Sequence, residues 1–150
     1  MKHLHIPTEE KDFVKRLTIN ADVARQMLCG FIRDEMDKAG MRRAVIGLSG
    51  GIDSALSAYL AAEALGAENV LAVRMPYRTS SQDSLDDADL VIRDLGLQTM
   101  TVPITDMADA LIGQFPDMNG LRKGNIMARL RMIVLYDQSA TYGGLVVGTS

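Results

Sequence analysis

The amino-acid sequence predicts an α/β fold: a doubly wound, Rossmann-like parallel sheet with helices on both of its faces. Two observations lead to this expectation. Short apolar runs rich in Val and Ile alternate along the chain with longer helix-like segments, which is the pattern of strands joined by crossover helices. Each of these runs is almost free of polar residues, as expected of strands that are buried on both faces. Crossover connections are nearly always right-handed, so few topologies need to be considered.

The expected elements follow one another in a regular order. Asn20 can cap a first main helix that ends at Lys38-Ala39-Gly40, and we expect this helix to pack on the sheet. Its apolar residues recur at three- and four-residue spacing and are Val23, Ala24, Met27, Leu28, Phe31, Ile32 and Met36. In chain order there follow a strand over 44–48, a helix from 55 to Leu65-Gly66, a strand over 70–75, a helix from Ser81 to 95, a strand over 98–102, a short helix over 106–114, a long helix from its cap Asn125 through Tyr142, and a strand over 145–148. Thr8 could cap a further short helix near the start.

The order of the strands decides where a ligand would bind. If the first three strands step outwards on one side and the fourth returns to the other side of the first, the order is 3-2-1-4 in the part of the sheet present. Ligands of such sheets bind at the switch point, here between the first and fourth strands. That crevice would have residues 49–54 on one lip and Thr149 on the other.

The chain turns from its first strand into a helix through Ser49-Gly50-Gly51-Ile52-Asp53-Ser54, here called the Ser49–Ser54 turn. Adjacent glycines let the backbone approach a ligand closely, and a new helix offers unpaired N–H groups and a positive dipole end. Because the Asp53 carboxylate would repel phosphate unless a cation lay between them, the turn predicts a nucleotide bound with Mg²⁺. The alternative is that the glycines only turn the chain and that Asp53 caps the helix.

Composition limits the class of protein. With 150 residues, 47% of them hydrophobic and 23% charged, the chain is the size and make-up of one globular domain. A net charge of -3 lacks the basic footprint of a nucleic-acid-binding protein, so small-molecule substrates are favoured and no nucleic acid is expected. Cys29 is the only cysteine and lies in an apolar helical pattern, which favours a buried thiol and a cytoplasmic location. No stretch is apolar for the length of a membrane span.

Four aspartates stand close together in the first half of the 81–95 helix: Asp83, Asp86, Asp87 and Asp89. They could be a metal-binding cluster. Carboxylates in the first turns of a helix are also what its dipole favours, and we expect this second explanation to hold.

The Ser49–Ser54 turn resembles the pyrophosphatase loop of the ATP pyrophosphatase superfamily. It is not a Walker A loop, since no Gly-Lys-Ser/Thr follows the glycines. Three further stretches look like successive motifs of the ammonia-dependent NAD⁺ synthetase family, the second being the most specific: 72–81, 122–132 with its Gly-Asn-Ile-Met-Ala-Arg-Leu-Arg, and 146–150. Together with the turn they cover the chain from about Ala21 to its end.

The resemblance implies a two-step ligase with ATP as co-substrate. The carboxylate of deamido-NAD⁺ would attack the α-phosphate of ATP, pyrophosphate would leave with Mg²⁺, and ammonia would then displace AMP to form the amide of NAD⁺. By the family motif, Asp53 would hold Mg²⁺, and Ser49 and Ser54 would act with it in catalysis. The resemblance also implies that Arg74 lies beside the adenosine of ATP. The residues that would bind ATP are Gly47, Leu48, Ser49, Gly50, Gly51, Ile52, Asp53, Ser54, Arg74 and Thr149.

Two arginines of the long helix are candidates for binding the dinucleotide. Arg129 and Arg131 are two residues apart and therefore point about 160° away from each other on a helix. The family resemblance assigns the deamido-NAD⁺ contact to Arg131 and leaves Arg129 for a structural ion pair. In the alternative, both are solvated surface charges. Tyr136 would bind in the same substrate site or be an ordinary packed tyrosine.

In one respect the sequence departs from the family. The family has a second Mg²⁺ ligand, a glutamate a few residues beyond Gly-Thr-Ser, and later lysines that bind the substrates. These residues have no counterpart here, because the sequence ends at Ser150. The resemblance is therefore to the first part of a synthetase, with one ATP-pyrophosphatase-type domain over 1–150 that is truncated at its C-terminal end. These 150 residues, taken alone, are expected to bind nucleotide poorly and to make little or no NAD⁺. Family members are homodimers, which would give the 125–142 helix a partner.

Rival functions remain open within and outside this superfamily. One is another synthetase with the same loop, similar to GMP synthetase or to the synthetase domain of a glutamine-dependent NAD⁺ synthetase. No glutaminase nucleophile is visible, because Cys29 lies in a helix. The other is a non-catalytic nucleotide-binding module.

Overall fold

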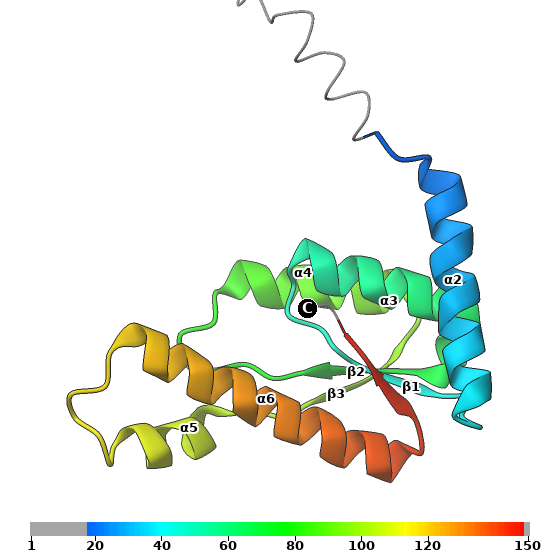
Figure 1. The fold of residues 1–150 in the computed structure, drawn as a ribbon. Helices are drawn as coiled ribbons and strands as arrows, with labels where there is room; N and C mark the ends of the chain where they lie inside the picture. Colours follow the sequence, from blue (N-terminus) through cyan, green and yellow to red (C-terminus); the bar gives the residue numbers. More distant parts are fainter. Residues whose placement is uncertain (1–17, 149–150) are drawn as a thin grey trace, which may run out of the picture.

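Four parallel strands form the centre of the computed structural model, which describes residues 18–148 (Figure 1). The strands are β1 (Ala44–Gly47), β2 (Val70–Arg74), β3 (Gln98–Thr101) and β4 (Leu145–Val147). Their order in the sheet is β3-β2-β1-β4, so the predicted order 3-2-1-4 is confirmed. The short helix predicted at Thr8, and Thr149, lie outside the described residues.

The described helices are α2 (Ala21–Lys38), α3 (Ile52–Leu65), the 3₁₀ helix η1 (Ala67–Asn69), α4 (Gln82–Leu95), α5 (Thr105–Ile112) and α6 (Gly120–Tyr142). Three of the described α-helices, α2, α4 and α6, begin at residues whose side chains cap them, and α3 to α6 end at glycines. Asn20 accepts a hydrogen bond from the backbone N–H of Val23 at 3.1 Å, and Ser81 accepts one from that of Ser84 at 3.2 Å. Both caps are therefore confirmed.

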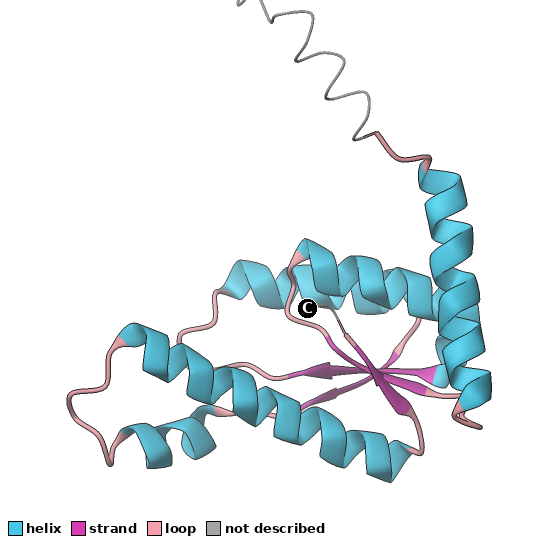
Figure 2. Cartoon of the chain, viewed as in Figure 1, coloured by secondary structure: helices cyan, strands magenta, loops and turns pink. Residues whose placement is uncertain are grey.

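Alternate residues of the strands point to opposite faces of the sheet, and each face is covered by helices (Figure 2). On one face Ala44, Ile46, Val70 and Ala72 pack with α3 and α4. On the other, Val45, Leu71 and Val73 form a second core cluster with buried residues that include Ile104 and Val134 of α6. The predicted doubly wound sheet with helices on both faces is thus confirmed.

The long helix begins earlier than the sequence analysis predicts. Asn119, not Asn125, is its N-cap, and it accepts a hydrogen bond from the N–H of Arg122 at 3.0 Å. The prediction of Asn125 as the cap was wrong, because the helix already begins at Gly120. Glycine at the first position of a helix weakens it little when the residue before it supplies a side-chain cap.

The helix α2 packs mainly against α3 rather than on the sheet, as Figure 1 shows by its upright position at the ends of the other helices. Of its predicted apolar stripe only Met36 is buried, and Ile32 packs beside it. Val23, Met27, Leu28 and Phe31 are exposed, so the expectation that the stripe packs on the sheet is wrong for most of it. The Cys29 side chain is buried, as predicted, and its thiol donates to the carbonyl of Leu60.

Candidate nucleotide-binding site

The Ser49–Ser54 turn follows the C-terminal end of β1, where β1 lies between β2 and β4. The N–H of Leu48 donates to the carbonyl of Val73 at 3.0 Å and extends the parallel pairing by one residue. The N-cap of α3 is Gly51, which makes no side-chain capping bond. Asp53 is exposed in the first turn of α3. The alternative in which Asp53 caps the helix is therefore wrong.

Two serine hydroxyls hold the turn in shape. The Ser54 Oγ donates to the carbonyl of Gly51 at 2.8 Å and lies 3.1 Å from the Ser49 Oγ. The Ser49 Oγ accepts from the N–H of Gly51 at 3.2 Å, and the Ser54 Oγ accepts from the N–H of Ser49 at 3.3 Å. These bonds, called here the serine network, fix the backbone just before the unpaired N–H groups at the start of α3.

Gly50 brings the turn into direct contact with the next helix. Its φ of +82° lies in the left-handed region, which favours glycine. A Cβ atom at this position would lie 2.1 Å from the backbone carbonyl oxygen of Ser84 in α4. The turn and the first turn of α4 can therefore lie side by side only if residue 50 is glycine.

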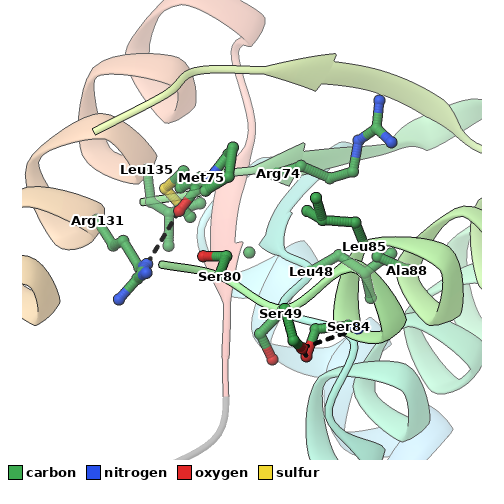
Figure 3. Close-up of a pocket in the computed structure, with 13 residues that line it drawn as sticks. Leu48, Ser49, Arg74, Met75, Ser80, Ser84, Leu85, Ala88, Arg131 and Leu135 are labelled. Carbon is green, nitrogen blue, oxygen red and sulfur yellow. Dashed lines mark hydrogen bonds between the residues drawn. The ribbon is translucent and has the colours of Figure 1, made fainter. Parts of the chain in front are cut away.

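A cavity of about 350 Å³ lies between these segments. The ends of β1 and β2, the loop into α4, and α6 all contribute to it, as Figure 3 shows. Its lining residues are Gly47, Leu48, Ser49, Arg74, Met75, Pro76, Ser80, Ser81, Ser84, Leu85, Ala88, Arg131 and Leu135. The structure thus brings together residues from four places in the chain at the carboxyl edge of the sheet, where ligands of such folds bind.

The cavity does not include all the predicted site residues. Gly47, Leu48, Ser49, Arg74 and Arg131 line it. The rest of the turn, from Gly50 to Ser54, adjoins it without lining it, and Thr149 lies outside the described residues. The Tyr136 side chain is 64% exposed and is not part of the lining, so the structure does not bring it together with Arg131 in this cavity.

The two arginines of the cavity differ in their partners. Arg74 forms an ion pair with Asp89 of α4. Arg131 donates from its Nε to the carbonyl of Met75 at 3.2 Å and has no ion-pair partner among the described residues. Burial lowers the pKa of Arg131 below its ordinary value because desolvation disfavours the charged form. An anionic ligand beside Arg131 would offset that cost.

Three serines of the cavity, Ser80, Ser81 and Ser84, were not among the predicted binding residues. The loop that carries the first two is anchored from α5, where Asp109 accepts from the Tyr77 hydroxyl at 2.8 Å and pairs with Arg78 at 2.9 Å. The sequence does hold a signal for them, because loops after neighbouring parallel strands meet at one edge of the sheet. Here these are the loops after β1 and β2.

Within the candidate site, a magnesium ion could be held only by Asp53 together with ligands from a bound nucleotide and water. No group of three or more His, Cys, Asp or Glu that could hold a metal occurs within residues 18–148. Asp53 could supply one carboxylate oxygen, and a nucleotide's phosphate oxygens and water would have to supply the rest. Mg²⁺ is commonly held in this way, through one or two carboxylates and substrate phosphates.

Comparison with known proteins decides the family. Residues 24–150 match the model of the family described as NAD synthase. The chain belongs to the NAD synthase family. A curated NH₃-dependent NAD⁺ synthetase from Trichlorobacter lovleyi is 58% identical over 137 residues, which are 91% of this chain and 50% of that relative. The chain therefore spans about half the length of the curated relatives it matches.

Solved structures agree with this family and with the fold. The NH₃-dependent NAD synthetase from Campylobacter jejuni, solved with a nitrate ion, has a TM-score of 0.82 at 39% identity, over 88% of this chain and 57% of that one. The NMN synthetase from Francisella tularensis has a TM-score of 0.81 at 30% identity, over 89% of this chain and 56% of that one. None of the helices in the described part of this chain has the length and apolar character to cross a membrane.

Proposed function

We propose that this NAD synthase chain carries the ATP-binding and adenylating part of a ligase that converts deamido-NAD⁺ to NAD⁺ with ammonia and ATP. One observation carries the proposal: in a member of the NAD synthase family, a strand-to-helix turn with serine hydroxyls and helix-start N–H groups lies beside a cavity lined by Arg131, which has no ion-pair partner among residues 18–148. The reaction needs charge on the departing pyrophosphate to be neutralised and two substrates to be held in line. The turn suits the first need and the cavity suits the second.

The residues of the turn would hold the phosphates of ATP. Ser49, Gly50 and Gly51 lead into the first N–H groups of α3, which attract anions through hydrogen bonds and through the helix dipole. The hydroxyls of Ser49 and Ser54 can turn from one another to donate to phosphate oxygens, because each is exposed in part. Leu48 and Gly47 would border the nucleotide, and Ile52 would flank the phosphates. Thr149 would contact ATP across the crevice from the turn.

The carboxylate of Asp53 would hold Mg²⁺ at the outer side of the phosphates, since it is exposed in the first turn of α3. When bound, Mg²⁺ supplies charge that offsets the negative charge of the pyrophosphate leaving group. Deamido-NAD⁺ would approach from the α6 side of the cavity, where the Arg131 guanidinium can donate in a fork to its phosphates.

An assay of pyrophosphate release tests the adenylation step. The chain is incubated with Mg-ATP, ammonia and either deamido-NAD⁺ or nicotinate mononucleotide, and pyrophosphate and the amide product are measured. We expect release that depends on deamido-NAD⁺ from the full-length protein, and little or none from the 150 residues taken alone, as the sequence analysis predicts. Asp53→Ala should weaken Mg²⁺-dependent ATP binding while leaving the urea midpoint unchanged, because the residue is exposed at a helix start.

Two outcomes would point to other functions. Faster release with the mononucleotide would favour an NMN synthetase, a function suggested by the similarity to the Francisella tularensis protein. ATP binding without any release would favour a nucleotide-binding module. An Asp53→Ala variant with unchanged Mg²⁺ dependence would remove this residue from the metal role.

We also infer that the chain forms a homodimer through the 125–142 part of α6. Met132, Ile133 and Tyr136 are exposed by 47%, 60% and 64% and lie within about one turn on one side of the helix. Arg131 on the other side faces the cavity. In such a dimer Tyr136 would lie at the subunit boundary, where it could reach a substrate in the partner's cavity. A cytoplasmic location would suit a protein whose one cysteine, Cys29, is a free thiol.

A further inference from the structure

Arg74 is the last residue of β2, and its side chain lines the candidate ATP cavity. One terminal nitrogen of its guanidinium donates to the Asp89 carboxylate of α4. The Nε atom is buried and has no hydrogen-bond partner among the described residues. The guanidinium is thus held on one side by a carboxylate, and no bond within the described residues occupies its other terminal nitrogen.

The helix dipole does not explain why a carboxylate stands at position 89. It lies two turns into α4, whereas the favourable effect of a helix N-terminus on carboxylates fades within the first turn. The other aspartates of this helix differ from it: Asp86 accepts from Gln82 one turn earlier, and Asp87 is exposed. Among the described acidic residues of α4, Asp89 alone pairs with an arginine that lines the cavity.

The pairing changes the charge that the cavity offers to a ligand. Arg131 has no ion-pair partner among residues 18–148, so its charge is available to an anion. The charge of Arg74 is largely offset by Asp89 at short range. Figure 3 shows the Arg74 guanidinium directed away from Arg131 and from Ser49. Phosphates would therefore be drawn to the Ser49 and Arg131 sides, and an uncharged group would suit the Arg74 side.

We propose that Asp89 is a positioning residue for the nucleotide: it holds the Arg74 guanidinium against α4 and offsets its charge, so that Arg74 meets the adenosine end of ATP and not its phosphates. This inference rests on the proposed ATP-binding function. The second terminal nitrogen of the Arg74 guanidinium, which is not the one bonded to Asp89, then donates to an acceptor on the nucleoside.

Two probes and four variants test the proposal. Mg-ATP and Mg-tripolyphosphate, which lacks the nucleoside, are titrated into ¹⁵N-labelled chain and followed by NMR, including the arginine Nε–H signals. The variants are Asp89→Asn, Arg74→Ala, the double variant, and Asp87→Asn as a control that removes the same charge from an exposed position of the same helix.

Asp89→Asn should weaken ATP binding by about tenfold, the effect of losing one hydrogen bond to a charged group. It should not weaken tripolyphosphate binding, because it frees the charge of Arg74 that Asp89 offsets. The double variant should bind ATP no more weakly than Arg74→Ala, because Asp89 acts through Arg74. The Arg74 Nε–H signal should move on addition of ATP and stay in place with tripolyphosphate. Asp87→Asn should bind both probes as the unaltered chain does.

Parallel losses for ATP and tripolyphosphate in Asp89→Asn would show that Asp89 only supports the fold. A further loss in the double variant beyond that of Arg74→Ala would equally overturn the proposal. If the unaltered chain binds ATP and Asp89→Asn behaves like Asp87→Asn, this inference falls and the proposed function stands. If the unaltered chain binds no ATP, both fall.

Discussion

At Gly50 the backbone of the Ser49–Ser54 turn passes against the carbonyl of Ser84, and the space for a side chain is already taken. We predict that Gly50→Ala lowers the free energy of unfolding by about 2 kcal/mol or more, since it adds a collision with backbone to an unfavourable φ. Urea unfolding followed by circular dichroism measures the change.

Gly96→Ala is the matched control for this prediction. Gly96 also has a positive φ, +65°, but nothing lies within 4 Å of the added Cβ, so only the conformational cost of about 1 kcal/mol is expected there. Equal losses at both positions would mean that Ser84 moves aside and that the turn and α4 are not held together as described.

Arg131 and Arg129 provide a second test at the scale of single residues. Arg131→Lys keeps the charge but loses the fork of donors and the Nε bond to Met75. It should weaken binding of deamido-NAD⁺ by about tenfold and weaken ATP binding less, as measured by titration calorimetry. Arg129, which is exposed, serves as the control. A larger effect from Arg129→Lys would place the dinucleotide on the other side of α6.

Among the elements, the start of α6 offers a direct test because two asparagines compete for the role of cap. Asn119→Ala should cost about 1 kcal/mol of stability, since it removes the bond to the N–H of Arg122. Asn125→Ala should cost nothing, because this residue is exposed inside the helix, where alanine is favoured. The urea midpoints of the two variants measure these losses. A larger loss of stability for Asn125→Ala than for Asn119→Ala would mean that the helix begins at Asn125, as predicted from the sequence.

The elements also show what could be predicted from the sequence. The four strands and the caps Asn20 and Ser81 could be found because apolar runs and capping residues are local signals. The sequence could not show that Met36 is buried while Phe31 is exposed. Both residues have the spacing of an apolar stripe, and only the position of α3 distinguishes them. The same holds in the site. The turn is a local motif, whereas the Arg74–Asp89 pair depends on how α4 lies beside β2.

At the scale of the whole molecule, the apolar side of α6 predicts an assembly. Ile133→Glu should raise the dimer dissociation constant at least tenfold, because a charge would be buried against an apolar partner. Sedimentation velocity over a range of concentrations measures it. Leu90→Glu is the control, since Leu90 is 61% exposed on α4 and so matches the 60% exposure of Ile133. A monomeric unaltered chain, or equal effects from both variants, would contradict pairing through α6.

The serine network has a consequence for the thermodynamics of binding. Because Ser49, Gly51 and Ser54 already bond to one another, the turn has its shape before any phosphate arrives. Little conformational entropy remains to be lost when a nucleotide binds, so the turn is preorganised, and more of the interaction free energy is retained as affinity. Replacing both hydroxyls would therefore weaken binding in two ways, by removing donors to phosphate and by letting the free turn sample shapes that cannot hold it.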